Sequence, residues 1–209
     1  MVKSTPTFDF ETAARAQGFA RIAGVDEVGR GPLAGPVVAA AVVLDPANIP
    51  DGLNDSKQMT VKRREALYDI LHDVSDVGVA EASVREIEEF NILRASHMAM
   101  VRALSKLSTP ADHALIDGNM VPKGLNVSAT TIIKGDTRSL SIAAASIVAK
   151  VWRDRLMMTL AQQHPGYGWE TNAGYPTKEH KARLKSHGIT LHHRRTFKPV
   201  HNILWQQEK

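Results

Sequence analysis

The sequence predicts an α/β fold: a mixed five-stranded sheet flanked by helices, with a helical extension at the C-terminal end. Two features lead to this prediction. Two apolar segments, 22–28 and 37–44, are joined by a short glycine-rich loop, and they are expected to form an antiparallel hairpin. After residue 60, helical and extended segments alternate along the chain. A hairpin followed by such alternation indicates a sheet with both antiparallel and parallel pairing.

The composition limits the class of protein. A chain of 209 residues, 43% hydrophobic and 23% charged, is long enough for one sizeable globular core. It contains no cysteine, which excludes disulfides and thiolate metal sites, and its net charge of +4 permits a polyanionic partner without requiring one. No apolar run reaches the ~20 residues of a membrane span, and the N-terminus lacks the apolar core of a signal peptide. We therefore expect a cytoplasmic protein without membrane contact.

Five segments have the length and composition of strands. Segment 22–28 carries β-branched residues with little helical period. Segment 37–44 is an uninterrupted apolar run, which is typical of a strand covered on both faces. The remaining strands are expected at 77–82, 114–116 and 126–133.

The helices are predicted from their apolar spacing and from the residues at their ends. A short helix is expected before Gly18, and the longest helix runs from 138 to about 163, where Pro165 and Gly166 stop it. The other helices are expected at 60–72, as two consecutive helices between 83 and 109, and at 177–186. Their N-terminal caps are expected at Thr60, at Ser83 with Glu86 as a capping box, at Asn91 and at Thr177.

Four acidic residues stand at the ends of these elements. Asp26 and Glu27 close the first strand, Asp117 closes a central strand, and Asp136 lies in a turn before the longest helix. Each of them alone fits a helix cap or a solvated loop charge, but together they can converge at one edge of the sheet. Clustered carboxylates repel one another, and Mg²⁺ or Mn²⁺ relieves that repulsion with oxygen ligands. Two such ions can support phosphodiester hydrolysis.

One geometric condition applies to the first pair. Neighbouring residues on a strand point to opposite faces, so Asp26 and Glu27 can reach one site only if the strand ends or bulges there. The loop that follows, with Gly29 and Gly31, makes such a bulge feasible.

The glycine-rich loop is not a nucleotide cradle. A dinucleotide fingerprint must open a helix, whereas Pro36 and a β-branched run follow this loop, and the Gly-Lys-Ser/Thr of a Walker loop is absent from the sequence. Glycines still allow a ligand to approach the backbone closely, and Arg30 can bind a phosphate with its planar guanidinium. We therefore expect Gly29, Arg30 and Gly31 to contact substrate.

Several longer motifs resemble bacterial ribonuclease HII, in the order in which that family has them. They are DEVGRGPLAG at 26–35, NDSK at 54–57, LIDGN at 115–119, KGD at 134–136, SIAAASIVAKVWRDR at 141–155, GYPT at 174–177 and HRRTF at 193–197. Together they extend over roughly residues 20–200. The resemblance implies an RNase H-like fold, with residues 1–20 as a peripheral segment and residues 21–209 as the catalytic domain, its C-terminal helical region included.

The same resemblance implies a metal-dependent endonuclease. Asp26, Glu27, Asp117 and Asp136 would be both its catalytic acids and its metal ligands, with Mg²⁺ or Mn²⁺ as cofactor. The family hydrolyses RNA in RNA–DNA hybrids and cuts on the 5′ side of a single ribonucleotide in duplex DNA, leaving a 3′-hydroxyl and a 5′-phosphate. This chemistry starts the removal of misincorporated ribonucleotides.

Further substrate contacts follow from the same motifs. The Gly-Arg-Gly loop at 29–31 would contact the ribose 2′-hydroxyl, and Tyr175 would stack at the ribonucleotide–deoxyribonucleotide junction, with Tyr167 as the weaker candidate. Phosphate contacts are expected from Lys57, Ser139, Ser146 and Lys150. For Lys150 the competing interpretation is a helix ion pair with Asp154, four residues on.

The basic tail is open to two interpretations. Arg194 and Arg195 either hold the duplex or are simply solvated, and the histidines at 180, 187, 192 and 193 are expected at the surface. We also expect a monomer without a sliding-clamp peptide.

Two alternative functions stay open at this point. A DNA nuclease of the same fold would cut DNA that contains no ribose. A catalytically silent module would bind hybrids without turnover, although clustered acids give no advantage in binding a polyanion.

Overall fold

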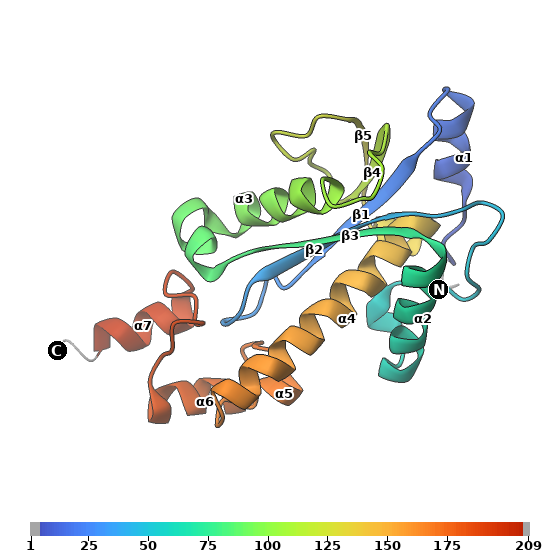
Figure 1. The fold of residues 1–209 in the computed structure, drawn as a ribbon. Helices are drawn as coiled ribbons and strands as arrows, with labels where there is room; N and C mark the ends of the chain where they lie inside the picture. The colour runs from blue at the N-terminus through green and yellow to red at the C-terminus, as the bar shows by residue number, and fades with distance from the viewer. Residues whose placement is uncertain (1–4, 207–209) are drawn as a thin grey trace.

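The computed structural model describes residues 5–206 and contains one five-stranded sheet in the order β3-β2-β1-β4-β5 (Figure 1). The strands are β1 (Ile22–Val28), β2 (Val37–Val43), β3 (Asp76–Ala82), β4 (His113–Asp117) and β5 (Ser128–Ile132). β1 pairs antiparallel with β2, and β2 pairs antiparallel with β3, whereas β4 lies parallel to both β1 and β5. The predicted mixed sheet and its initial hairpin are confirmed.

Helices cover both faces of this sheet. They are α1 (Asp9–Ala16), α2 (Val61–Val74), α3 (Val84–Leu104), α4 (Leu140–Gln163), α5 (Trp169–Asn172), α6 (Lys178–His187) and α7 (Lys198–Gln206), with short 3₁₀ turns η1 (Ser56–Gln58) and η2 (Gly135–Thr137). α3 lies on one face, whereas α4 and α2 lie on the other, and α5–α7 extend beyond the end of α4 (Figure 1). Within the described residues, no helix is both long and apolar enough to cross a membrane.

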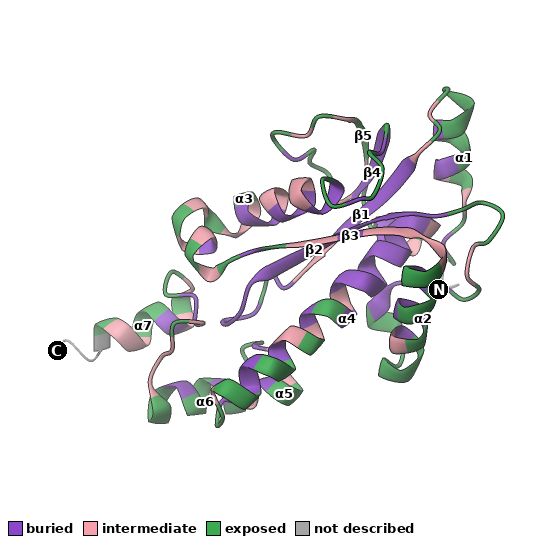
Figure 2. Cartoon of the chain, in the orientation of Figure 1, coloured by how far each residue is buried: buried purple, intermediate pink, exposed green. Residues whose placement is uncertain are grey.

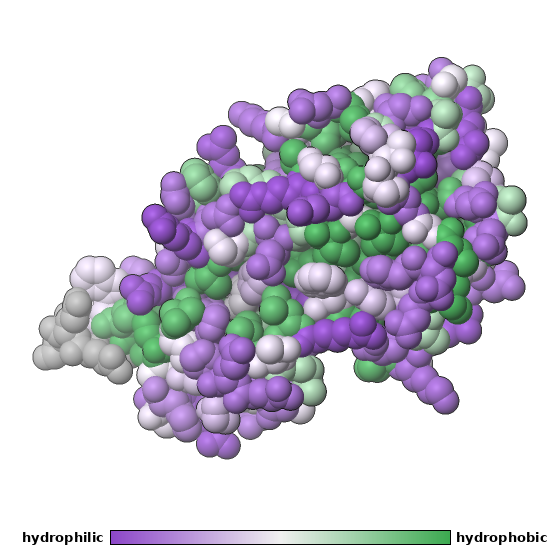
Figure 3. All heavy atoms as spheres, in the orientation of Figure 1, coloured by the Kyte–Doolittle hydropathy of each residue, from purple (hydrophilic) through white to green (hydrophobic). Residues whose placement is uncertain are grey.

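The core follows from the alternation of side chains along the central strands. Ala23 and Val25 of β1 pack in the cluster beneath α3, whereas Ala40 and Val42 of β2 pack against α4 and α2. Burial is therefore nearly complete along β1, β2 and the first half of α4 (Figure 2). In the view of Figure 3, apolar side chains also show over the edge strand β3, between α3 and α4.

A glycine allows the longest helix to lie directly on the sheet. A Cβ atom on Gly24 would lie 2.1 Å from the carbonyl carbon of Ser141 and 2.3 Å from the backbone nitrogen of Ile142. Because no side chain fits there, α4 packs on the bare backbone of β1 and brings its polar residues close to the end of that strand.

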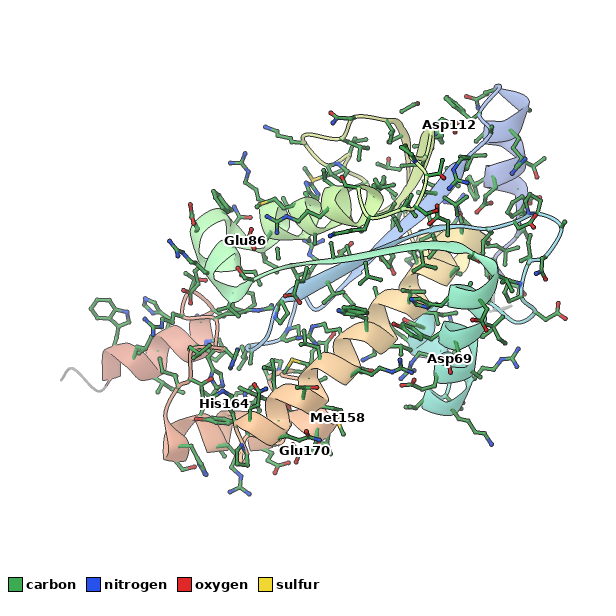
Figure 4. The ribbon with its side chains drawn as sticks, viewed as in Figure 1. Asp69, Glu86, Asp112, Met158, His164 and Glu170 are labelled. Atoms are coloured by element: carbon green, nitrogen blue, oxygen red, sulfur yellow. The ribbon has the colours of Figure 1, made fainter. Side chains whose placement is uncertain are left out.

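The predicted helix caps are confirmed. The Thr60 hydroxyl accepts a hydrogen bond from the Arg63 amide, and Ser83 and Glu86 form the full capping box. Asn91 adopts φ 68° inside α3, and its side chain accepts hydrogen bonds from the amides of residues 93 and 94, so α3 is two helices joined at a kink. Glu86, labelled in Figure 4, also accepts a hydrogen bond from Nη2 of Arg102 at 2.5 Å.

Helix α7 was not predicted, because the basic residues from 192 onward obscure its apolar spacing. Val200 is nevertheless fully buried with Leu33 and Leu184, and Phe197 and Ile203 pack on the same cluster. The tail is thereby fastened to the loop between β1 and β2.

The N-terminal segment is joined to the start of α4. The amide of Thr7 donates to the Arg138 carbonyl, and the amide of Leu140 donates to the Thr7 carbonyl, both at 3.0 Å. Glu11 of α1 is 1% exposed, and its Oε1 accepts hydrogen bonds from both hydroxyls of Ser139 and Ser141 and from the Ser141 amide. A carboxylate at this position is favourable, because helix N-termini attract negative charge.

Candidate active site

Parallel pairing of β1 with β4 brings the predicted acids together. The last residues that these strands pair are Val25 and Ile116, and Asp26 and Asp117 follow directly at the same end of the sheet. The start of β1 is held by Asp112, labelled in Figure 4, whose carboxylate accepts hydrogen bonds from two backbone amides, those of residues 20 and 21. The register that places the acids side by side is thus fixed at both ends.

Asp136 joins this group through the turn that follows β5. The Gly135 amide donates to Oδ1 of Asp117 at 2.7 Å, which ties η2 to the end of β4. A Cβ atom on Gly135 would lie 2.5 Å from Cδ1 of Ile142 and 3.3 Å from Oδ1 of Asp117, so any larger residue there would displace the Ile142 side chain. Asp136 is 7% exposed, and it lies just before the N-terminus of α4.

The acids carry negative charge that their surroundings do not fully neutralise. Burial raises the pKa of Asp26 well above its usual value, and repulsion from Glu27 and Asp117 adds to this. A hydrogen bond from Ser146 acts in the opposite direction. Burial also raises the pKa of Glu27 and, together with the charges of neighbouring acids, that of Asp136. Such a site favours the arrival of cations.

Two cationic side chains already contact these acids. Nζ of Lys57 lies 3.5 Å from Oδ2 of Asp136 and 3.9 Å from Oδ1 of Asp55. Burial lowers the pKa of Lys57, but the nearby acids outweigh burial and raise it overall. Nη1 of Arg30 lies 3.2 Å from Oε1 of Glu27. Both cations therefore lie at the rim of the acidic cluster and partly offset its charge.

The expected strand end or bulge at the first two acids is wrong. β1 continues in regular antiparallel register, with Asp26 opposite Ala40 and Glu27 opposite Ala39. Glu27 therefore shares the α3 face with Val25, whereas Asp26 faces α4. β4 ends at Asp117, so the edge of β1 that faces β4 has no paired strand beside Glu27. Asp26 and Glu27 therefore lie on opposite faces of the sheet next to this unpaired edge.

The residues fit divalent cations by their chemistry. Across residues 5–206, no three acidic or histidine side chains are close enough together to hold a metal ion. The donor set is nonetheless one of hard carboxylate oxygens on three adjacent elements, and the pKa values of Asp26, Glu27 and Asp136 are raised, chiefly by burial. Carboxylates of this kind are the ligands that Mg²⁺ and Mn²⁺ prefer.

The structure places Tyr175 beside the glycine loop. A Cβ atom on Gly31 would lie 3.6 Å from Cε1 of Tyr175, a residue that is 39% exposed. The amide of Leu33 also donates to the carbonyl of Gly174 at 2.7 Å. The weaker candidate, Tyr167, is 5% exposed and stacks on Trp169, so it is a packing residue.

The predicted phosphate contacts divide into exposed and buried groups. The Lys57 side chain is 74% exposed, whereas that of Lys150 is 20% exposed, and its Nζ lies 2.6 Å from Asp154. Ser139 is fully buried and caps α4, and Ser146 is 3% exposed with its hydroxyl 2.9 Å from that of Ser56. Neither serine hydroxyl can reach a phosphate in this arrangement, so a phosphate contact from these two positions is not supported. Ser146 instead supports Asp26.

Two expectations about the tail were wrong in part, because charge in a sequence does not reveal burial, although His187 and Arg195 are exposed. Arg194 is fully buried, and so are His180 and His193. His164, labelled in Figure 4 at the end of α4, lies with its ring 4.8 Å from that of His192, so the histidines gather around α5 and α6.

Sequence reasoning also missed Arg153. It is fully buried in α4, where Ala149, Met157 and Leu160 are buried on the same side. This regular spacing was a usable signal, because an arginine in an apolar stripe has to find partners inside the protein.

Taken together, a mixed sheet of this strand order, with acids at adjacent strand ends, defines a nuclease of the RNase H-like class. Comparison with known proteins gives the particular family. The family model for ribonuclease HII matches residues 23–202, and the chain belongs to that family. Its members are endoribonucleases that act on RNA–DNA hybrids and depend on divalent metal ions.

Individual relatives agree with this assignment. The chain is 67% identical over 202 residues to a ribonuclease HII of Ruegeria pomeroyi, covering 97% of this chain and 86% of that one. The ribonuclease H2 structure from Pyrococcus horikoshii matches with a TM-score of 0.75 and 33% identity, over 91% of this chain and all of that one. A ribonuclease HII from Archaeoglobus fulgidus, solved in complex with PCNA, matches with a TM-score of 0.69 and 25% identity, over 85% of this chain and 95% of that one.

Proposed function

We propose that the protein cuts duplex DNA on the 5′ side of a single embedded ribonucleotide, in addition to RNA in hybrids, and so begins ribonucleotide removal. One observation carries this proposal: Tyr175, from the segment between α5 and α6, lies against Gly31, which is on the loop that directly follows Asp26 and Glu27. The loop that would contact the ribose and the two acids that would support hydrolysis then belong to one hairpin, formed by β1 and β2.

In this proposal the acids hold the metal ions. Asp26, Glu27, Asp117 and Asp136 would bind two ions, Mg²⁺ or Mn²⁺, which when bound activate a water and stabilise the leaving 3′-oxygen. Ser146 keeps the Asp26 carboxylate in place, and Gly135 does the same for Asp117.

Other side chains would position the nucleic acid. Lys57, largely exposed and next to Asp136, is placed to bind the phosphate of the scissile strand. Arg30 would leave Glu27 for a phosphate oxygen. The loop backbone would donate to the 2′-hydroxyl, the group that distinguishes RNA from DNA. Tyr175 offers an exposed ring on which a base or sugar can stack.

The catalytic unit comes from one chain. The acids, the glycine loop and Tyr175 all belong to the same protomer, which supports a monomer, and sedimentation of the free protein tests this.

The experiment uses three duplexes: DNA with one ribonucleotide, an RNA–DNA hybrid and all-DNA. With Mg²⁺ or Mn²⁺ we expect cleavage of the first two, a 3′-hydroxyl at the cut, and no activity in Asp26→Asn. Cleavage of all-DNA would instead identify a DNA nuclease, and binding without cleavage would identify a silent module. Either result would overturn the proposal, as would full activity of Asp26→Asn.

A further inference from the structure

We propose that two buried arginines, Arg153 in α4 and Arg194 after α6, are positioning residues that fix the glycine loop in the conformation that reads the ribose. The inference rests on the proposed function, because it explains how the proposed ribose contact is built. Neither arginine can touch substrate, since both are fully buried.

Arg194 binds the backbone of the loop through all three nitrogens of its guanidinium. Its Nη2 donates to the Gly29 carbonyl at 2.6 Å, its Nη1 to the Arg30 carbonyl at 3.1 Å, and its Nε to the Gly35 carbonyl at 2.9 Å. These three acceptors lie at both ends of the loop. One side chain, more than 150 residues further along the chain, therefore closes the loop.

Arg153 holds the other half of the same loop. Its Nη2 donates to the Ala34 carbonyl and its Nε to the Pro36 carbonyl, both at 3.0 Å. Its Nη1 donates to the Ala173 carbonyl at 2.9 Å, two residues before Tyr175. The same guanidinium thus links the glycine loop to the segment that carries the stacking ring.

The loop glycines are required by this arrangement. A Cβ atom on Gly29 would lie 2.2 Å from Nε of Arg153, and Gly29 has φ 95°, which favours glycine. A Cβ atom on Gly35 would lie 2.5 Å from Sδ of Met157 and 3.4 Å from Nη2 of Arg153. Arg153 therefore explains the glycine at position 29, whereas the glycine at position 35 makes room mainly for Met157.

The arginines are not there for packing. No carboxylate forms an ion pair with either of them in the described structure, and Phe197 lies under the Arg194 guanidinium at 5.0 Å. Burial lowers the pKa of Arg153 to about 10 and that of Arg194 to about 9, so both remain charged at neutral pH. Burying an uncompensated charge is costly, and an apolar side chain would fill the space at lower cost. What the cations contribute is six directed hydrogen bonds to carbonyl oxygens.

Those hydrogen bonds set the direction of the loop amides. In a trans peptide the carbonyl and the next amide point to opposite sides, and the described chain contains no cis peptide. Because the carbonyls of Gly29 and Arg30 point to Arg194, the amides of Arg30 and Gly31 point away from it. These two amides therefore point to the side of the loop opposite Arg194. By binding the carbonyls, Arg194 orients both amides so that they can donate to a ribose hydroxyl on that side.

The test measures discrimination between substrates. In an Asp26→Asn background with Mg²⁺, affinity is measured for a duplex with one ribonucleotide and for the all-DNA duplex. Arg194→Lys and Arg153→Lys keep the charge, but one ammonium cannot serve three separated carbonyls. We expect the ratio of the two affinities to fall about tenfold, which is equivalent to about 1.4 kcal/mol, because the loop amides that would contact the ribose lose their fixed direction. Affinity for all-DNA should stay within about twofold, since phosphate contacts are untouched.

The matched control is Arg183→Lys, an exposed arginine of α6 that makes only a weak ion pair at 4.0 Å. If the buried arginines are purely structural, their replacement lowers the melting temperature but leaves the folded protein's ratio of affinities for the two duplexes unchanged. That result would overturn the inference. If the Asp26→Asn protein with both arginines intact binds the two duplexes equally well, the proposed function is wrong, and the result says nothing against the role of the arginines.

A measurement without arginine variants covers the case in which those variants do not fold. Hydrogen exchange of the Arg30 and Gly31 amides is followed in the same background, free and with each duplex. We expect stronger protection by the ribonucleotide duplex than by all-DNA. Equal protection by both would show that these amides do not read the ribose, which contradicts the inference.

Discussion

Removing the buried carboxylate of Glu11 should destabilise the protein strongly, although Glu11 lies outside the proposed site. The Oε1 atom accepts from both serine hydroxyls of the α4 N-terminus and from the Ser141 amide, with distances of 2.5–2.9 Å. In Glu11→Ala these three donors lose their acceptor inside a site that is 1% exposed. The perturbation therefore affects both a buried hydrogen-bond network and the start of the longest helix.

The magnitude can be worked from these contacts. Three hydrogen bonds to a charged acceptor, at about 1.5–3 kcal/mol each, give a gross loss of about 4.5–9 kcal/mol. The desolvation of the carboxylate, whose Oε2 has no hydrogen-bond partner among the described residues, offsets several kcal/mol of this. The expected net loss in the free energy of unfolding is about 3 kcal/mol for Glu11→Ala. Glu11→Gln keeps one oxygen acceptor and should lose about half as much.

The assay is denaturant unfolding followed by far-UV circular dichroism. Asp9→Ala is the control, because Asp9 is exposed on the same helix and should cost well under about 1 kcal/mol. A double-mutant cycle with Ser139→Ala should give a coupling energy above about 1 kcal/mol. If Glu11→Ala destabilises no more than Asp9→Ala, the carboxylate does not hold α4, and the reasoning is refuted.

Three further predictions concern binding and pH. Tyr175→Ala should leave the melting temperature nearly unchanged, because the residue is 39% exposed, but should weaken binding of the ribonucleotide duplex about tenfold in a titration. Burial lowers the pKa of His193 to about 3, below its unfolded value, so the folded state binds fewer protons and stability should fall as the pH drops from about 6.5 toward 3. In His193→Gln, unfolding measured at several pH values should show a smaller dependence of the unfolding free energy on pH, and an unchanged dependence would assign it to other groups. Arg94 and Lys123 line a groove of about 550 Å³ beside the segment that follows Asp117. Replacing each by alanine should reduce the slope of the logarithm of the duplex binding constant against the logarithm of salt concentration by about one. An unchanged slope would place the duplex elsewhere.

The elements of the fold were predictable because their signals are local. Strand β1 and the helix caps at Thr60, Ser83 and Asn91 match the structure to within a residue or two, since apolar spacing and capping chemistry act between close neighbours. The sequence also allowed Asp26 and Asp117 to converge at one edge of the sheet, and the structure shows that the parallel pairing of β1 with β4 brings this about. Helix α7 was missed, because its apolar residues are recognisable as a packing face only when Leu33 and Leu184 are seen beneath them.

The environment of each polar residue was predicted less well. Ser139 and Arg194 occur in motifs that fit nucleic-acid contacts, yet each is buried against a partner far away in the chain: Glu11 for the serine, and the glycine-loop carbonyls for the arginine. A motif shows that a residue type is required at a position, but it does not show whether the side chain faces the substrate or the protein. Only the fold separates these cases, because the partners lie 128 and 165 residues apart in sequence.

This distinction bears on how the site achieves selectivity. The acids lie at the ends of strands whose register is fixed by backbone hydrogen bonds, so their placement depends little on any one side chain. The glycine loop has no such ladder, and glycine-rich backbone is flexible unless something holds it. Five hydrogen bonds from two buried arginines, one in α4 and one in the C-terminal extension, supply that support, and a sixth links α4 to the Ala173 carbonyl. In the proposed scheme the extension serves the reading of the sugar rather than the hydrolysis itself, so changes that loosen it should relax selectivity before they abolish turnover.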